Sequence, residues 1–112
     1  MARRKLSLST IRRVANALAG VEEGTSYGTP AWRFKGRLLA RLHQDGQSLV
    51  LKVGNRTRDH LLEADLGTFF ATDHYRGHPT VLARLDRLNT SDLRKLIERA
   101  TAIHPSGARS KR

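Results

Sequence analysis

The most constraining feature of the chain is a period-two alternation of apolar residues on both sides of an Asp-Gly pair. The alternating residues are Leu38, Ala40 and Leu42 before the pair and Leu49, Leu51 and Val53 after it. Such alternation is typical of strands that bury one face. Asp45-Gly46 predicts a two-residue type I′ turn, because that turn needs positive φ at both central positions. A two-residue loop pairs Leu42 with Leu49 and Leu38 with Val53, so the register keeps the apolar partners on one face.

The alternation extends toward the N-terminus. Trp32 and Phe34 alternate with Arg33 and Lys35, which predicts a further strand before Lys35-Gly36. A two-residue loop there would place Leu38 on the face opposite Phe34. We therefore expect a three-residue or bulged loop at this turn.

Helical periodicity frames the strands. The first helix is indicated by apolar residues spaced three and four apart, with Ser9 or Thr10 as cap and Gly20 beyond its end. Residues 20–30 contain three glycines and a proline and are interpreted as an ordered loop. A short helix is expected over residues 58–64, strands over 68–72 and 81–85, and a final helix capped by Thr90 or Ser91. The predicted fold class is α+β, an antiparallel sheet with helices packed on one face, in the order α-β-β-β-α-β-β-α.

Length and composition restrict the alternatives. A chain of 112 residues holds one domain with one modest core. The chain has no cysteine, so disulfides, thiolate metal sites and cysteine nucleophiles are excluded. No uninterrupted apolar run is long enough for an export signal or a spanning helix, so the expected location is the cytoplasm and no membrane partner is expected.

The charge is strongly basic and unevenly placed. The chain has 21 Lys and Arg against 10 Asp and Glu, a formal charge of +11. We interpret residues 1–8 and 105–112 as basic tails and residues 9–104 as the single domain. Six cations belong to the tails, which leaves the rest of the chain with 15 basic and 10 acidic residues.

Basic side chains occupy the outward positions of the predicted strands. The candidate phosphate-binding residues are Arg33, Lys35, Arg37, Arg41, Lys52 and Arg84. No acidic residue lies within the strands over residues 31–43 and 48–53. This pattern predicts a surface that follows a nucleic-acid backbone, and a sheet face that is merely kept soluble by its charges is the alternative.

Two loops form the basis of a rival interpretation, a small-molecule or catalytic site. Its residues would be Tyr27, from the segment 24–30, and Asp73, His74 and Tyr75, from the segment 73–79. The segment 24–28 also matches the G-x-S-x-G pattern of a nucleophile elbow, but that motif needs a helix after Ser26, and Pro30 and a strand follow. His74 and His78 are four apart, yet Gly77 and Pro79 argue against the helix that would align them on a metal.

Four segments in order resemble the MmcQ/YjbR family of small bacterial proteins. They are residues 21–31, 34–40, 51–53 and 73–82, and the resemblance extends over about residues 9–103. It implies a compact α+β fold similar to bacterial frataxin and to a double-wing DNA-binding motif. The acidic ridge of frataxins has no counterpart in the first helix, which carries Arg12 and Arg13.

The sequence therefore favours a non-enzymatic nucleic-acid-binding domain that contacts the phosphate backbone, with duplex DNA as the expected partner and a monomer as the expected state. It predicts no catalytic residue, no metal and no cofactor.

Overall fold

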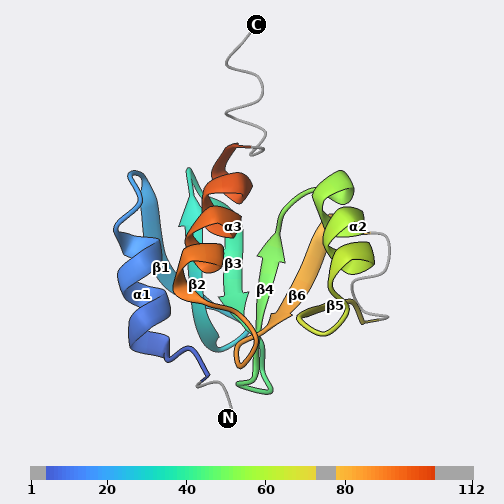
Figure 1. Ribbon diagram of the computed structural model, residues 1–112. Coiled ribbons are helices and arrows are strands. Elements are labelled where there is room, and N and C mark those ends of the chain that lie inside the picture. Colours follow the sequence, from blue (N-terminus) through green and yellow to red (C-terminus); the bar gives the residue numbers. More distant parts are fainter. Residues whose placement is uncertain (1–4, 73–77, 103–112) are drawn as a thin grey trace, which may run out of the picture.

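A computed structural model of the protein describes residues 5–72 and 78–102. Its elements are α1 (Leu8–Asn16), β1 (Val21–Ser26), β2 (Thr29–Phe34), β3 (Arg37–Leu42), β4 (Ser48–Lys52), α2 (Asn55–Ala64), β5 (Phe69–Phe70), β6 (Thr80–Arg84) and α3 (Thr90–Ala102). The strands form one six-stranded sheet in the order β1-β2-β3-β4-β6-β5, and every paired neighbour is antiparallel (Figure 1). The predicted α+β class is confirmed, with one strand more than expected before α2.

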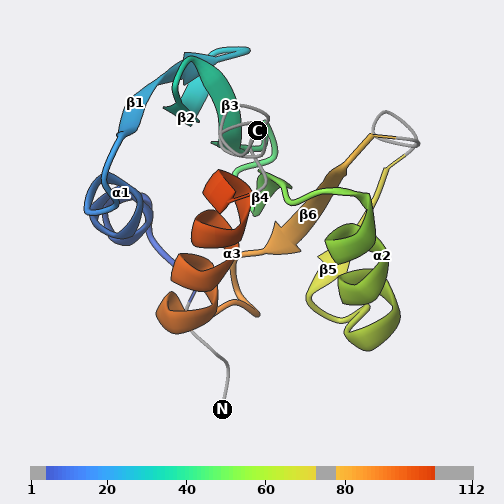
Figure 2. The ribbon, with the colours of Figure 1, turned by 90° about the horizontal axis from the view of Figure 1, so that it is seen from above.

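The main core lies between the sheet and the helices. α1 and α3 lie side by side against one face of the curved sheet, and α2 lies beside β5 and β6 (Figure 2). Core residues from the helices include Ile11, Val14, Leu93 and Ile97, which meet the fully buried Trp32 of β2. Because these side chains project from the helix side of the sheet, the other face is left without α1 or α3 to cover it. We call that other side the open face.

The additional strand is β1, within the segment expected to be a loop. Residues 21–26 pair with β2 along their whole length, from Val21 opposite Phe34 to Ser26 opposite Thr29. Tyr27 and Gly28 form the turn between them, with φ of 54° and 79°. Positive φ at both central positions is the type I′ geometry that suits the twist of a hairpin. The loop interpretation of residues 20–30 was therefore wrong.

The turn at Lys35-Gly36 is a second two-residue hairpin turn, with φ of 52° and 81°. The expected irregularity lies in β3 instead of in the loop. Trp32 pairs with Ala40 and Arg33 pairs with Leu38, so Leu39 is an extra, bulged residue. The bulge places Leu39 and Ala40 together in the core and leaves Leu38 half-buried on the open face beside Arg33.

The β3–β4 hairpin has the predicted register near its turn but a different turn type. The predicted pairing of Leu38 with Val53 is wrong, because the bulge at Leu39 turns Leu38 to the open face while Val53 lies in the core. Leu42 pairs with Leu49 and Ala40 with Leu51. Gly46 has a φ of 69°, whereas Asp45 is not in the left-handed region, so the predicted type I′ turn is wrong. The Gly46 N–H donates to the His43 carbonyl at 2.9 Å, and the Asp45 carboxylate accepts from the Gln47 N–H at 2.7 Å. The Asp45 side chain thus supports the turn by bonding the backbone two residues on.

Both helix caps differ from the expected ones. The Ser7 side chain, not Ser9 or Thr10, caps α1 by accepting from the Thr10 N–H at 3.1 Å. Asn89, not Thr90 or Ser91, accepts from the Asp92 N–H at 2.8 Å at the start of α3. In each case the helix begins one or more residues earlier than its apolar periodicity suggests.

The N-terminal boundary of the domain also lies earlier. The Leu6 N–H donates to the Leu85 carbonyl at 3.0 Å, and Leu6 and Leu8 pack against the core. These residues had been assigned to the tail. Within residues 5–72 and 78–102, no helix is long and apolar enough to cross a membrane.

Candidate nucleic-acid interface

The open face is organised by one continuous cross-strand row. Residues aligned by the register are Ala31 on β2, Arg41 on β3, Val50 on β4, Leu82 on β6 and Phe70 on β5. The middle of this row is closely packed, because all but Phe70 are buried. The middle of the open face is therefore buried, and its accessible cations lie toward the two ends of the strands.

Arg33 and Lys52 lie at one end of the open face. Trp32 and Leu51 both pair with Ala40, and Arg33 and Lys52 are the next residues along two strands that run in the same direction. Strands are about 4.8 Å apart, so these two cations lie within about 10 Å of each other, close enough to act jointly on one polyanion. Lys35 and Arg37 are exposed at the β2–β3 turn at the same end.

Arg33 and Arg84 are only partly exposed. The Arg33 Nη1 donates to the Thr25 carbonyl at 3.2 Å. At the opposite end of the face, the Arg84 guanidinium lies over the ring of Phe70, 4.3 Å from its centroid. Each retains some accessible surface, since both side chains are half-buried.

Arg41 departs most from the expectation. It projects to the open face, but it is only 4% exposed, so the prediction of an outward, solvated side chain is wrong. Its Nη1 lies 3.5 Å from the Thr29 hydroxyl and 3.4 Å from Oε1 of the Gln44 side chain, and its guanidinium lies 5.0 Å from the centroid of the Tyr27 ring. Burial and these partners fix the cation, so Arg41 positions the turn instead of reaching for a ligand.

The additional strand also brings two carboxylates to the sheet. Glu22 pairs with Arg33 and shares the open face, which reduces the positive potential at that edge. Glu23 points to the helix side, where it accepts from Arg12 Nε at 2.8 Å and from Asn16 Nδ2 at 3.1 Å. A loop over residues 20–30 gave no reason to expect that Glu22 and Glu23 point to opposite faces of the sheet.

Partial burial raises the pKa of the Glu23 carboxyl, but hydrogen bonds from Asn16 and Arg12 and the Arg12 charge outweigh it, so the pKa lies below its ordinary value. Asp45 follows the same logic. Burial raises the pKa of the Asp45 carboxyl, but the hydrogen bond from the Gln47 N–H and the neighbouring His43 lower it by more, so the net shift is downward.

The rival site is not assembled by the residues that the structure describes. Tyr27 lies at the tip of the β1–β2 turn and is 76% exposed. Asp73, His74 and Tyr75 lie outside the described residues. Ser26 is followed by a turn and a strand, not a helix, so the nucleophile-elbow geometry does not form. Across residues 5–72 and 78–102, no group of three His, Asp or Glu side chains could hold a metal.

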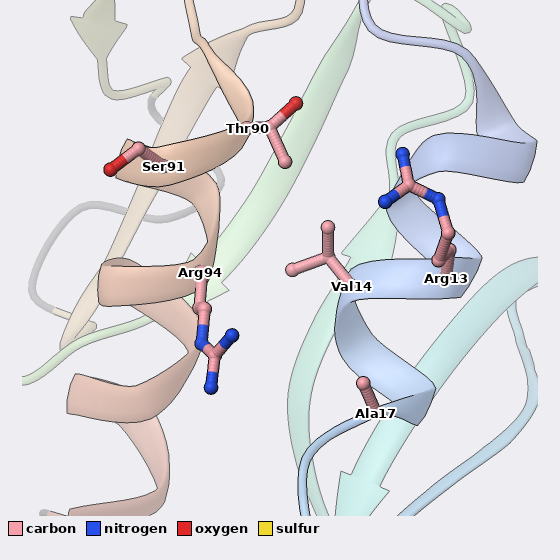
Figure 3. Close-up of a pocket in the computed structure, with 6 residues that line it drawn as sticks. All are labelled: Arg13, Val14, Ala17, Thr90, Ser91 and Arg94. Atoms are coloured by element: carbon pink, nitrogen blue, oxygen red, sulfur yellow. The ribbon is translucent and has the colours of Figure 1, made fainter.

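A cavity of about 190 Å³ lies elsewhere, between α1 and α3 (Figure 3). Val14 of α1 and Ala17, the C-cap of α1, form its apolar part, and Arg13 and Arg94 flank it from the two helices. Its volume is below the roughly 300 Å³ at which ligand pockets typically begin. The cavity lies on the helix side, remote from the open face. Arg13 and Arg94 can therefore serve as control positions in a test of binding by the open face.

The family model described as YjbR matches residues 16–100. The chain belongs to the YjbR family. This YjbR-family chain is also similar to the crystal structure of Deinococcus radiodurans protein DR2400, whose domain is described as DUF419.

The likeness to the Deinococcus protein has a TM-score of 0.71 and 20% sequence identity, and it covers 89% of this chain and 80% of the other. At that identity it shows a shared fold. No curated protein matches this YjbR-family chain significantly in sequence. The resemblance expected from the four ordered segments is thus confirmed for the family and for the α+β architecture.

Proposed function

We propose that this protein is a non-enzymatic nucleic-acid-binding domain, with DNA as its ligand and phosphate contacts made from the open face. The observation that supports the proposal is the placement of Arg33 and Lys52 at the same end of the open face, on either side of β3, with Lys35 and Arg37 at the adjoining turn. Arg33 and Lys52 project to the open face from β2 and β4, whereas Lys35 and Arg37 lie at the β2–β3 turn at the same end of the sheet, where Arg37 pairs with the core-facing Phe34. A phosphate backbone is the polyanion that such a cluster of charges fits.

Arg84 extends the same face at its other end, and Arg41 contributes by holding the turn that carries Tyr27. The double-wing arrangement and the cytoplasmic location belong to this proposal as well. The turns of the β1–β2 and β3–β4 hairpins lie at the same end of the sheet, next to Arg41. They would flank a bound nucleic-acid strand.

The test compares two double variants that each remove two positive charges. Arg33→Ala with Lys52→Ala removes charge from the open face, and Arg13→Ala with Arg94→Ala removes it from the helix side. Each phosphate contact on duplex DNA adds about 0.9 to the slope of log affinity against log salt. The open-face variant should therefore lose about 1.8 in slope, with weaker binding at low salt.

The helix-side variant should keep the slope of the unaltered protein, measured by fluorescence anisotropy across a salt series. Equal losses in the two variants would mean that binding follows net charge alone. That result would contradict an interface on the open face.

A further inference from the structure

Tyr27 is exposed in a way that the packing of the domain does not require. It occupies the first position of the β1–β2 turn with a φ of 54°, in the left-handed region. Asn, Asp and Gly are favoured there, and a bulky residue at positive φ is a strained exception. Such strain is maintained where the surrounding structure enforces it, and it accumulates at functional positions.

Arg41 packs against the Tyr27 side chain. Its guanidinium lies over one face of the Tyr27 ring and is itself buried and bonded to Thr29 and Gln44. The Thr29 hydroxyl in turn donates to the Ser26 carbonyl across the turn at 3.0 Å. The Arg41 guanidinium thus packs against one face of the Tyr27 ring, while 76% of the residue stays exposed.

The two other cation–aromatic pairs lack this exposed ring. Phe70 under Arg84 and Phe34 beside Lys35 are both half-buried, and Phe34 packs against the core. Tyr27 is therefore the aromatic side chain, among the residues described, that presents a ring to solvent from a fixed support. A supported and exposed aromatic ring is the feature on which an unpaired base stacks.

We propose that Tyr27 is a stacking platform for an unpaired base, so that the domain prefers single-stranded nucleic acid to duplex. This inference rests on the proposed function and adds the form of the ligand. Arg33 and Thr29 are four residues apart on β2, which places the phosphate-binding end about 13 Å from the Tyr27 turn along the same face. One single strand running along β2 would place phosphates at Arg33 and Lys52 and a base on Tyr27.

The test uses oligothymidine, a matched strand in which the bases are replaced by abasic sites, and a blunt duplex. The abasic strand keeps the phosphates and removes only the groups that could stack. Tyr27→Ala should weaken oligothymidine binding by about 5-fold to 150-fold, the range for loss of one base stacked on an aromatic side chain. On the abasic strand and the duplex the same variant should bind as the unaltered protein does.

Two control variants complete the design. Tyr27→Phe keeps the ring and should retain binding to oligothymidine. Leu66→Ala removes the other large exposed apolar side chain, 68% exposed in the segment after α2, and should change nothing. Thermal unfolding of each variant checks that Tyr27→Ala leaves the domain folded.

The outcomes separate this inference from the proposed function. If Tyr27→Ala leaves oligothymidine binding unchanged, or weakens the normal and abasic strands equally, stacking on Tyr27 is refuted while phosphate binding by the open face stands. If the unaltered protein binds none of the three ligands at low salt, the proposed function fails and the stacking inference fails with it.

Discussion

At the scale of single residues, Glu23 shows how one carboxylate joins the first helix to the edge of the sheet. Its bonds to Arg12 and Asn16 lower its pKa, so the carboxylate stabilises the fold at pH values above the ordinary pKa of a Glu. This contribution is lost as the pH falls through the lowered pKa of the folded state. Glu23→Gln should cost up to about 1 kcal/mol at neutral pH and flatten the loss of stability on acidification.

Urea unfolding of both proteins from neutral to acidic pH measures this effect. Parallel stability curves for Glu23→Gln and the unaltered protein would show that the carboxylate contributes nothing. Glu22→Gln is the matched control, since Glu22 points to the open face and should leave the acid limb unchanged.

Residue-level detail is also where the sequence was least informative. The alternation correctly placed Arg41 on the open face, but alternation reports direction and not depth. Arg41 is buried because Thr29, Gln44 and Tyr27 surround it, and two of these come from segments distant from it in sequence. Exposure of Tyr27 depends on the same contacts, so only the folded arrangement reveals that the cation supports the ring.

At the scale of elements, the start of α1 provides a direct test of the structure. Ser7 accepts a hydrogen bond from the Thr10 N–H, whereas Ser9 lies inside the helix. Replacing a capping serine by alanine typically costs about 1 kcal/mol. Ser7→Ala should lower stability by about that amount, and Ser9→Ala should change it by less than about 0.5 kcal/mol, because alanine suits a helix interior. Urea unfolding measures both, and equal effects would contradict this boundary.

Hairpin register was the part of the fold best predicted from sequence. The pairing of Leu42 with Leu49 follows from keeping apolar residues on one face, and it held although the turn type was wrong. β1 was missed because its central residues, Glu22 to Thr25, are exposed and include a glycine. An edge strand without a buried face shows no apolar alternation, so local patterning cannot distinguish it from a loop. The Tyr27-Gly28 pair between the two segments was the remaining sequence signal for a hairpin turn.

At the scale of the whole molecule, the net charge of +11 is divided between the terminal segments and the rest of the chain. The family and the α+β class were predictable, because four ordered segments and a chain-wide alternation point to them together. The candidate interface was predictable only in part. The sequence identified which residues are basic. The sheet register shows that Arg33 and Lys52 lie at one end of the open face and that Arg84 lies at its other end.

The terminal cations provide the last test, because positive charge alone attracts a polyanion. Replacing Arg3, Arg4, Arg109, Lys111 and Arg112 by Gln removes charge only from residues outside the described ranges. Each cation that had neutralised a duplex phosphate should take about 0.9 from the salt slope. The variant should still bind at low salt, and the further loss caused by Arg33→Ala with Lys52→Ala should be as large as in the unaltered background if the two sets of charges act independently. Anisotropy titrations of the four proteins measure this. Abolished binding after the terminal replacements alone would locate the interaction in the termini and remove the open face from it.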